Sequence, residues 1–156
     1  MKRILNAEEV ATSGMINKHE QMENGEFRFR LVSEKDGSGY IRTVGGAKGA
    51  WQNSHYHIGI RECIIVQKGW IAFAKQFPSG VGIHMKILRD GEMIVVEPNV
   101  PYSIYMSAGA VTHTVKFGNT VVERVSGKAD WHACPELDRL VKDLSEEQIM
   151  FRANMC

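Results

Sequence analysis

Apolar and polar residues alternate in short runs along most of this chain. The stretch E-F-R-F-R-L-V-S at residues 26–33 alternates apolar with basic side chains, the period of a half-buried strand. Turn residues such as Asp36-Gly37 separate this run and its successors about every 8–12 residues, which is typical of an antiparallel sandwich or barrel. The pattern predicts about ten strands, at residues 26–33, 40–44, 50–59, 62–67, 70–77, 82–88, 92–97, 102–106, 111–117 and 120–125.

The two ends of the chain follow a helical period instead. Residues 7–13 have the composition of one or two helical turns before Gly14. Near the C-terminus, Pro135 suits the first turn of a helix, and Ser145 with Gln148 has the form of a capping box for a second short helix. Apolar residues recur at helical spacing between them, at Leu137, Leu140, Val141 and Leu144.

These patterns predict a single all-β domain. The length of 156 residues argues for one domain, and the roughly 30 residues of the helical tail are too few for a second. We expect the domain to span 1–156, with an antiparallel barrel core at about 26–125 and a short helical appendage at about 130–152.

Composition excludes several classes of protein. With 19 basic and 18 acidic residues, the net charge of +1 gives no electrostatic footprint for nucleic acid or anionic membrane. No apolar run approaches the roughly 20 residues of a membrane span, and the N-terminus lacks the apolar region of a secretory signal. The three cysteines form no paired framework, so we expect a reducing cytoplasm.

Metal-binding residue types gather in the stretch S-H-Y-H-I-G-I-R-E. If His55 and His57 lie on one strand, residues two apart share a face and can hold one ion together. Glu62 follows five residues later and adds a carboxylate within a predicted hairpin of residues 50–59 and 62–67. Two imidazoles and one carboxylate leave coordination positions open for substrate or oxygen.

This stretch resembles the first signature motif of the cupin superfamily, with Gly49, His55, His57, Glu62 and Gly69 at its fixed positions. The resemblance implies an antiparallel jelly-roll barrel that binds a divalent metal ion through the two histidines and the glutamate. It does not distinguish iron, manganese, nickel and zinc. Small cupins commonly pair, so a homodimer is also expected.

The second cupin motif is degenerate. Gly91 and Pro98 fit it, but Tyr102 stands where the resemblance implies a histidine that serves as fourth ligand. Three arrangements are open. Tyr102 could hydrogen-bond a metal-bound group, its phenolate could coordinate the metal, or His113 could replace the missing ligand. The last requires a hairpin around residues 107–110, which would turn His113 to the face of Tyr102.

Three functions agree with these residues. A divalent metal acting as Lewis acid on a small sugar-like substrate would give an isomerase or epimerase, with Tyr102 as catalytic acid or base. Two histidines and a carboxylate also suit a non-haem Fe(II) dioxygenase. A barrel that only binds a small molecule is the third possibility. Arg28 and Arg30 could hold an anionic substrate at the barrel mouth, or could simply form a solvated strand face.

Overall fold

The computed structural model describes residues 7–118 and 130–155, which fold into two antiparallel sheets with short helices at both ends. This confirms the predicted all-β jelly-roll fold with a C-terminal helical appendage. The first sheet has the order β1 (Met15–Gln21), β2 (Phe27–Ser33), β3 (Gly39–Val44), β11 (Val111–Phe117), β6 (Arg61–Lys68) and β9 (Met93–Val96). The second has the order β12 (His132–Ala133), β5 (His55–Tyr56), β10 (Tyr102–Met106), β7 (Trp70–Gln76) and β8 (Ile83–Arg89), and β4 (Ala50–Trp51) also pairs with β10.

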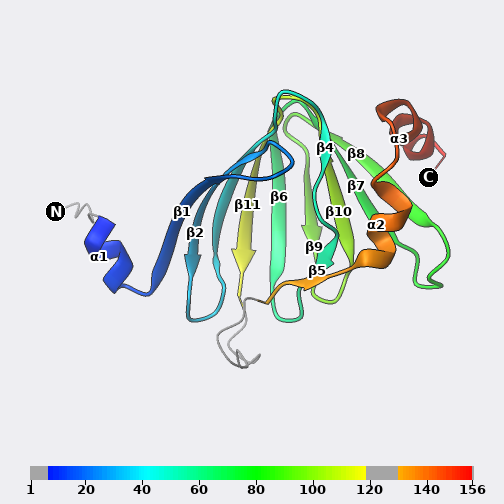
Figure 1. Ribbon diagram of the computed structural model, residues 1–156. Coiled ribbons are helices and arrows are strands. Elements are labelled where there is room, and N and C mark those ends of the chain that lie inside the picture. Colours follow the sequence, from blue (N-terminus) through cyan, green and yellow to red (C-terminus); the bar gives the residue numbers. More distant parts are fainter. Residues whose placement is uncertain (1–6, 119–129, 156) are drawn as a thin grey trace.

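The chain crosses repeatedly from one sheet to the other (Figure 1). Residues 50–59 and 62–67 do not form the predicted hairpin, because β5 pairs with β10 whereas β6 pairs with β11 and β9. Gly69 makes the crossing from β6 to β7 with a positive φ of 79°, a conformation that suits glycine. Side chains from both sheets therefore meet inside the barrel.

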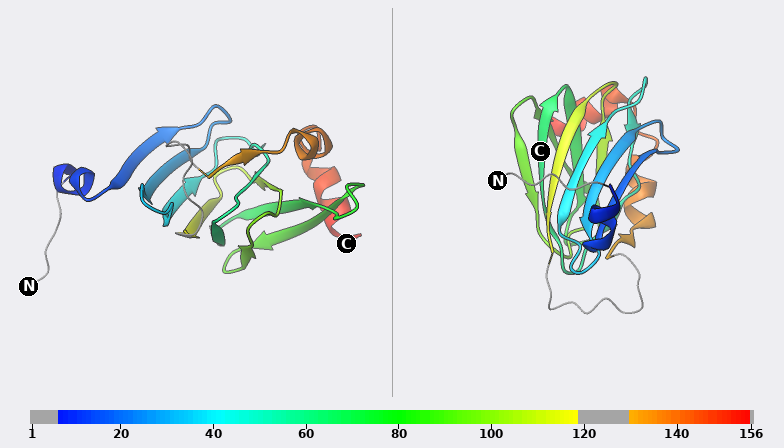
Figure 2. Two further views of the ribbon diagram at one scale, coloured as in Figure 1. Left: turned by 90° about the horizontal axis from the view of Figure 1, so that it is seen from below. Right: turned by 90° about the vertical axis from the view of Figure 1, so that its left-hand side faces the viewer.

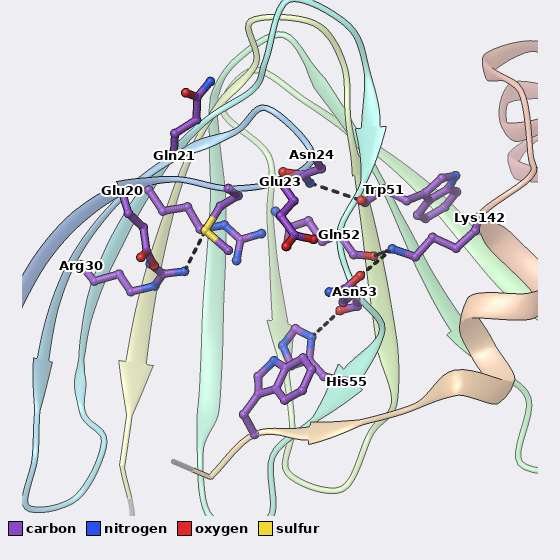
Figure 3. A pocket seen from close by; sticks show the side chains of 13 residues that line it. Glu20, Gln21, Glu23, Asn24, Arg30, Trp51, Gln52, Asn53, His55 and Lys142 are labelled. Atoms are coloured by element: carbon purple, nitrogen blue, oxygen red, sulfur yellow. Dashed lines mark hydrogen bonds and ion pairs between the residues drawn. The ribbon is translucent and has the colours of Figure 1, made fainter. Parts of the chain in front are cut away.

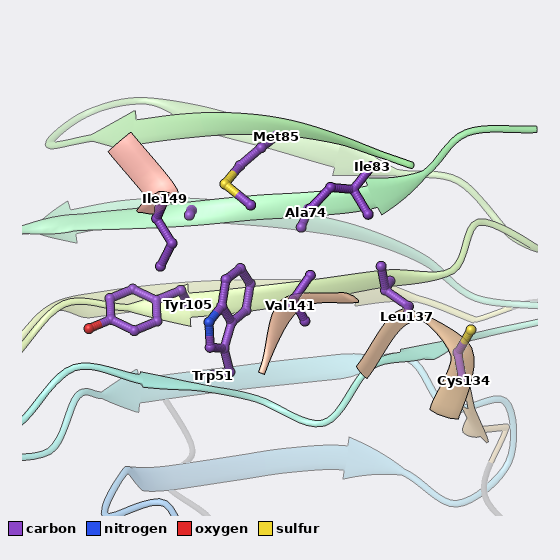
Figure 4. Packing of buried hydrophobic residues seen from close by; sticks show 10 residues of the cluster. Trp51, Ala74, Ile83, Met85, Tyr105, Cys134, Leu137, Val141 and Ile149 are labelled. Atoms are coloured by element: carbon purple, nitrogen blue, oxygen red, sulfur yellow. The ribbon is translucent and has the colours of Figure 1, made fainter. Parts of the chain in front are cut away.

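Two apolar clusters hold these layers together. The first lies between the sheets and includes Ile64 and Val66 of β6 with Phe73 of β7. The second lies between the outer face of the second sheet and the C-terminal helices α2 (Pro135–Val141) and α3 (Glu146–Ala153) (Figure 4). Its fully buried members include Leu137 and Val141 of α2 and Ile149 of α3. The helical tail thus covers one side of the barrel.

The two glycines of the stretch that resembles the first cupin motif lie at close approaches of the chain. A Cβ at Gly49 would overlap the hydroxyl of Tyr105, and one at Gly69 would lie 3.1 Å from the Ala110 Cβ. Both positions therefore require the absence of a side chain.

The ends of the chain agree with most of the sequence predictions. The short helix α1 (Ala7–Thr12) occupies the predicted N-terminal turns, and the capping box of Ser145 with Gln148 begins α3. Strand β1 was not predicted, because its sequence M-I-N-K-H-E-Q is largely polar and its side chains are mostly exposed. It extends the first sheet away from the barrel, as Figure 2 shows.

The strand predicted at 120–125 lies outside the described residues. Within the described part of the chain, every helix is too short or too polar to cross a membrane.

Candidate metal centre

His55, His57 and Glu62 come together inside the barrel. His55 lies on β5 of the second sheet, His57 directly follows that strand, and Glu62 lies on β6 of the first sheet. Each offers one ligand atom, and these atoms lie within 4.8 Å of one another. His57 and Glu62 are buried, with exposed fractions of 4% and 3%. The three residues thus form a group able to hold a metal ion.

Backbone carbonyls orient both imidazoles. The Nδ1 of His55 lies 2.8 Å from the carbonyl oxygen of Asn53, and the Nδ1 of His57 contacts the carbonyl oxygen of Asp130. A carbonyl oxygen only accepts, so each Nδ1 carries the proton and each Nε2 keeps a free lone pair. Such contacts are the usual way in which proteins orient a metal-binding histidine.

The Nε2 of His57 is the strongest indication of a metal. It is buried and has no hydrogen-bond partner, although the Glu62 Oε1 lies only 3.3 Å away. With the proton on Nδ1, two lone-pair atoms face each other across this gap, and a cation between them would satisfy both. Neighbouring ligands at about 2.1 Å from one metal ion lie roughly 3 Å apart, which agrees with this spacing. The residues therefore fit a divalent metal.

The protonation states of this group also suit a metal. Burial of His55 lowers its pKa to about 4, so its imidazole is neutral near pH 7. Burial alone would raise the pKa of Glu62, but a hydrogen bond and charge from the His57 ring in its protonated form, the Lys116 ammonium and the Tyr102 hydroxyl together lower that pKa to about 2. A neutral imidazole and an ionised carboxylate are the forms that bind metal.

Tyr102 lies beside the three candidate ligands. On β10 it pairs in register with His55, and its hydroxyl donates a hydrogen bond to the Glu62 Oε2. Burial and the adjacent carboxylate raise the pKa of Tyr102 well above its usual value of 10, which keeps the phenol protonated. This geometry favours the arrangement in which Tyr102 hydrogen-bonds within the site over direct coordination by a phenolate.

His113 does not join the group, and its prediction as a fourth ligand is wrong. Its Nδ1 lies 2.7 Å from the hydroxyl of Tyr40, and its Nε2 contacts the side chain of Gln67. The predicted hairpin around residues 107–110 does not form, because β10 belongs to the second sheet and β11 to the first. Lys116 of β11 points inward to Glu62, so alternation directs His113, three residues earlier, to the outer face.

Sequence reasoning missed three residues of the site. Lys116 lies in register opposite Glu62, and its Nζ is 3.3 Å from the Glu62 Oε1. The Asp130 carboxylate accepts hydrogen bonds from the backbone of Ile58 and Gly59 while its carbonyl orients His57. Trp131 stacks on His55 with ring centroids 5.3 Å apart. Only Lys116 gave a signal, as the one Lys, Arg, Asp or Glu in the strand V-T-H-T-V-K-F. Asp130 and Trp131 are remote in sequence from the motif.

A pocket of about 660 Å³ opens beside the candidate metal centre, with His55 and Trp131 in its wall (Figure 3). Arg28 and Arg30 also line it, as the sequence suggested, together with Gln52, Asn53 and Lys142. Arg28 bonds to the buried carboxylate of Glu26 at 2.7 Å, and Arg30 pairs with Glu20. The pocket is thus rich in polar groups and reaches His55, one of the three candidate metal ligands.

Comparisons with known proteins found similarity in fold but none in sequence. No protein-family model matches the chain, and no curated protein matches it in sequence. Among solved structures it is similar to CapF bound to an inhibitor, with 12% identity, coverage of 76% of this chain and 34% of that one, and a TM-score of 0.58. An oxalate decarboxylase of Lactobacillus farciminis in a formate complex gives 13% identity, 89% and 38% coverage, and a TM-score of 0.56.

KdgF of a Halomonas species is a neighbour that is matched over most of its own length. It shares 14% identity over 67% of this chain and 92% of its own, with a TM-score of 0.53. The chain spans only 28% of an oxalate decarboxylase of Bacillus subtilis, with 14% identity, 69% coverage of this chain and a TM-score of 0.54. At these identities the likeness is one of fold.

Proposed function

We propose that this protein, which has the jelly-roll fold of the cupins, is an enzyme that binds one divalent metal ion through His55, His57 and Glu62. The observation that carries the proposal is the buried, unpartnered Nε2 of His57 facing the Glu62 carboxylate. With a neutral His57 ring, this nitrogen and the carboxylate oxygen 3.3 Å away would face each other without a proton between them, and a cation would satisfy both. The adjoining pocket gives a small molecule access to the group.

The reaction that these residues support best is isomerisation or epimerisation of a small, oxygen-rich, sugar-like substrate. A bound divalent metal would supply Lewis acidity towards the oxygen atoms of such a substrate. Tyr102 keeps its phenolic proton and lies beside the candidate ligands, so it is the proposed proton-transferring residue. Its hydrogen bond to Glu62 fixes both the hydroxyl and the carboxylate.

The pocket suggests how the rest of a substrate is held. Gln52 and Asn53 provide amide groups in its wall, and Trp131 provides an aromatic face next to His55. The Arg28 guanidinium uses its Nε and one Nη for Glu26, which leaves the other Nη able to bind an anionic group. We therefore propose a hydroxylated substrate that carries an acidic group.

Oxygen chemistry at Fe(II) is the second candidate. Two histidines and one carboxylate are the ligand set of non-haem iron oxygenases, and a pocket adjoins His55. Oxygen uptake that depends on both Fe(II) and a substrate would favour this reaction. Turnover with manganese, nickel or zinc and without oxygen would favour the isomerase or epimerase.

Metal analysis of the purified protein tests the proposal directly. We expect about one divalent ion per chain by elemental analysis, and loss of that ion in His57→Ala. Circular dichroism should show an unchanged fold in the variant, and His84→Ala is a matched control that leaves the metal in place. Full metal occupancy in His57→Ala would contradict the site.

We also propose that the protein forms a homodimer through the outer face of the first sheet. One row on this face is largely apolar from β9 to β2, before Asn17 of β1 continues it: Val95, Cys63, Val115, Tyr40 and Leu31. Val95 is 47% exposed, and nearby Met93 and Phe117 are 53% and 54% exposed. A second copy of the same face would cover the apolar row. Arg42 and Arg61 lie on this face too and flank the row. The free thiols of Cys63 and Cys134 suit the reducing cytoplasm that we expect for this protein.

A further inference from the structure

Lys116 places a positive charge where a metal ion would bind. Its Nζ lies 3.3 Å from the Glu62 Oε1, the same oxygen that lies 3.3 Å from the His57 Nε2. The other oxygen of Glu62 accepts the hydrogen bond of Tyr102. The Oε1 is therefore the atom that Glu62 can offer to a metal, and Lys116 already contacts it.

The fold holds Lys116 in this place. It lies in register opposite Glu62 on the neighbouring strand, and Gly39 is its partner on the other side. The Lys116 side chain is 13% exposed, and the Glu62 carboxylate is the only acceptor that it contacts in the described residues. The charge of Lys116 also contributes to the lowered pKa values of His55 and Glu62, which is consistent with its place among them.

We infer that the Lys116 ammonium is an internal cation that pairs with Glu62 in the metal-free protein and competes with a divalent metal for that carboxylate. The inference rests on the proposed metal site. Metal binding must break or weaken the Lys116–Glu62 pair and bring a divalent charge close to an ammonium. Lys116 thereby lowers the affinity for metal, and once displaced from Glu62 it remains inside the barrel as a cation available to a substrate oxygen.

Calorimetric titration of the chelator-stripped protein with Mn²⁺ and with Zn²⁺ alone tests this inference. We expect Lys116→Met to bind each ion at least tenfold more tightly than the wild type, because the competing charge is gone. Lys116→Arg keeps the charge and should stay within about threefold of the wild type. Lys68→Met removes an exposed lysine from β6 and is the matched control, with no change expected.

The variants also separate this inference from the metal site itself. Lys116→Gln removes the charge but keeps a hydrogen-bond donor for Glu62, so it serves if the Met variant does not fold; it too should bind metal at least tenfold more tightly. Unchanged or weaker metal binding by a folded, uncharged variant would overturn the competition and leave the proposed site intact. Absence of metal binding in the wild type and in both uncharged variants would overturn the site as well. Binding in those variants alone would support the competition.

Discussion

The two faces of the first sheet carry opposite chemistry although the same strands build them. On the inner face, Glu62 of β6 and Lys116 of β11 lie in register beside the histidines. The very next residues in the chain, Cys63 and Phe117, point outward, in or beside the apolar row of the outer face. One residue along a strand therefore separates a buried ionic cluster from an exposed hydrophobic face.

This difference shows that the groups packed against a side chain decide whether a charge can be buried and whether an apolar side chain is covered. The inner charges are tolerated because each has a close counterpart: Glu62 contacts His57, Tyr102 and Lys116. The outer face of the second sheet is apolar too, but α2 and α3 pack against it. The outer face of the first sheet has no such helical layer in the described residues (Figures 1 and 2). Large apolar side chains on it, such as Val95 and Phe117, stay exposed.

The largest expected effect comes from changing the inner face. Glu62→Gln removes the only carboxylate of the candidate metal centre, so we expect divalent metal affinity to fall at least 100-fold, measured by calorimetry. Glu97→Gln, which alters an exposed carboxylate paired with Arg61, is the control and should bind metal normally. Equal metal affinity in Glu62→Gln and wild type would remove Glu62 from the site.

A charge on the outer face should instead change assembly. Val95→Lys places an ammonium at the β9 end of the apolar row, and we expect the dimer dissociation constant to rise at least tenfold. Light scattering coupled to size exclusion would then report the 17.5 kDa chain mass rather than twice that value. Val81→Lys, at a position that is 78% exposed in the turn after β7, serves as the matched control. A wild-type protein that is already monomeric would refute the dimer.

The inner face should also make stability depend on pH. The pKa of His55 is about 4 in the folded protein and about 6.5 when unfolded, so the unfolded chain binds more protons between these values. Above pH 6.5 His55 is neutral in both states, so its burial leaves stability unchanged there. As the pH falls from 6.5 to 4, protonation of His55 in the unfolded chain progressively lowers the free energy of unfolding. We expect the metal-free protein to lose roughly 2–3 kcal/mol of unfolding free energy across this window, from the size of the shift. Denaturant titrations at several pH values measure it, and His55→Gln should flatten the decline.

The smallest effect is expected for the histidine of the outer face. His113→Ala removes contacts with Tyr40 and Gln67, so about 1 kcal/mol of stability should be lost. Metal affinity should stay within twofold of the wild type, because His113 faces away from the group that binds it. A tenfold loss of metal affinity in this variant would contradict the assignment of the two faces.

Local patterns predicted much of the fold. Alternation located most strands of the barrel, Asp36-Gly37 located the hairpin between β2 and β3, and Ser145 with Gln148 located the start of α3. Strand β1 escaped prediction because an edge strand with mostly exposed side chains needs no apolar alternation. The sequence predicted the site best for residues that are close together in the chain, as His55, His57 and Glu62 are.

Strand pairing was the information that the sequence did not contain. A turn such as residues 107–110 is compatible with a hairpin or with a crossing between sheets, and the choice depends on where the distant strands β3, β6 and β7 lie. Because the chain crosses between the sheets here, β11 pairs with β6, so that His113 lies on the outer face and Lys116 lies opposite Glu62. Asp130 reaches His57 only because the chain returns to β5 through β12.

By itself, the sequence determined the all-β architecture, the helical tail and the three candidate metal ligands, because strand period, caps and short ligand spacing are local properties. The tertiary structure alone decided which face each side chain occupies, which groups share Glu62 and which surface stays uncovered. Those outcomes follow from contacts between residues far apart in the chain, whose energies depend on the register and the sheet to which each strand belongs.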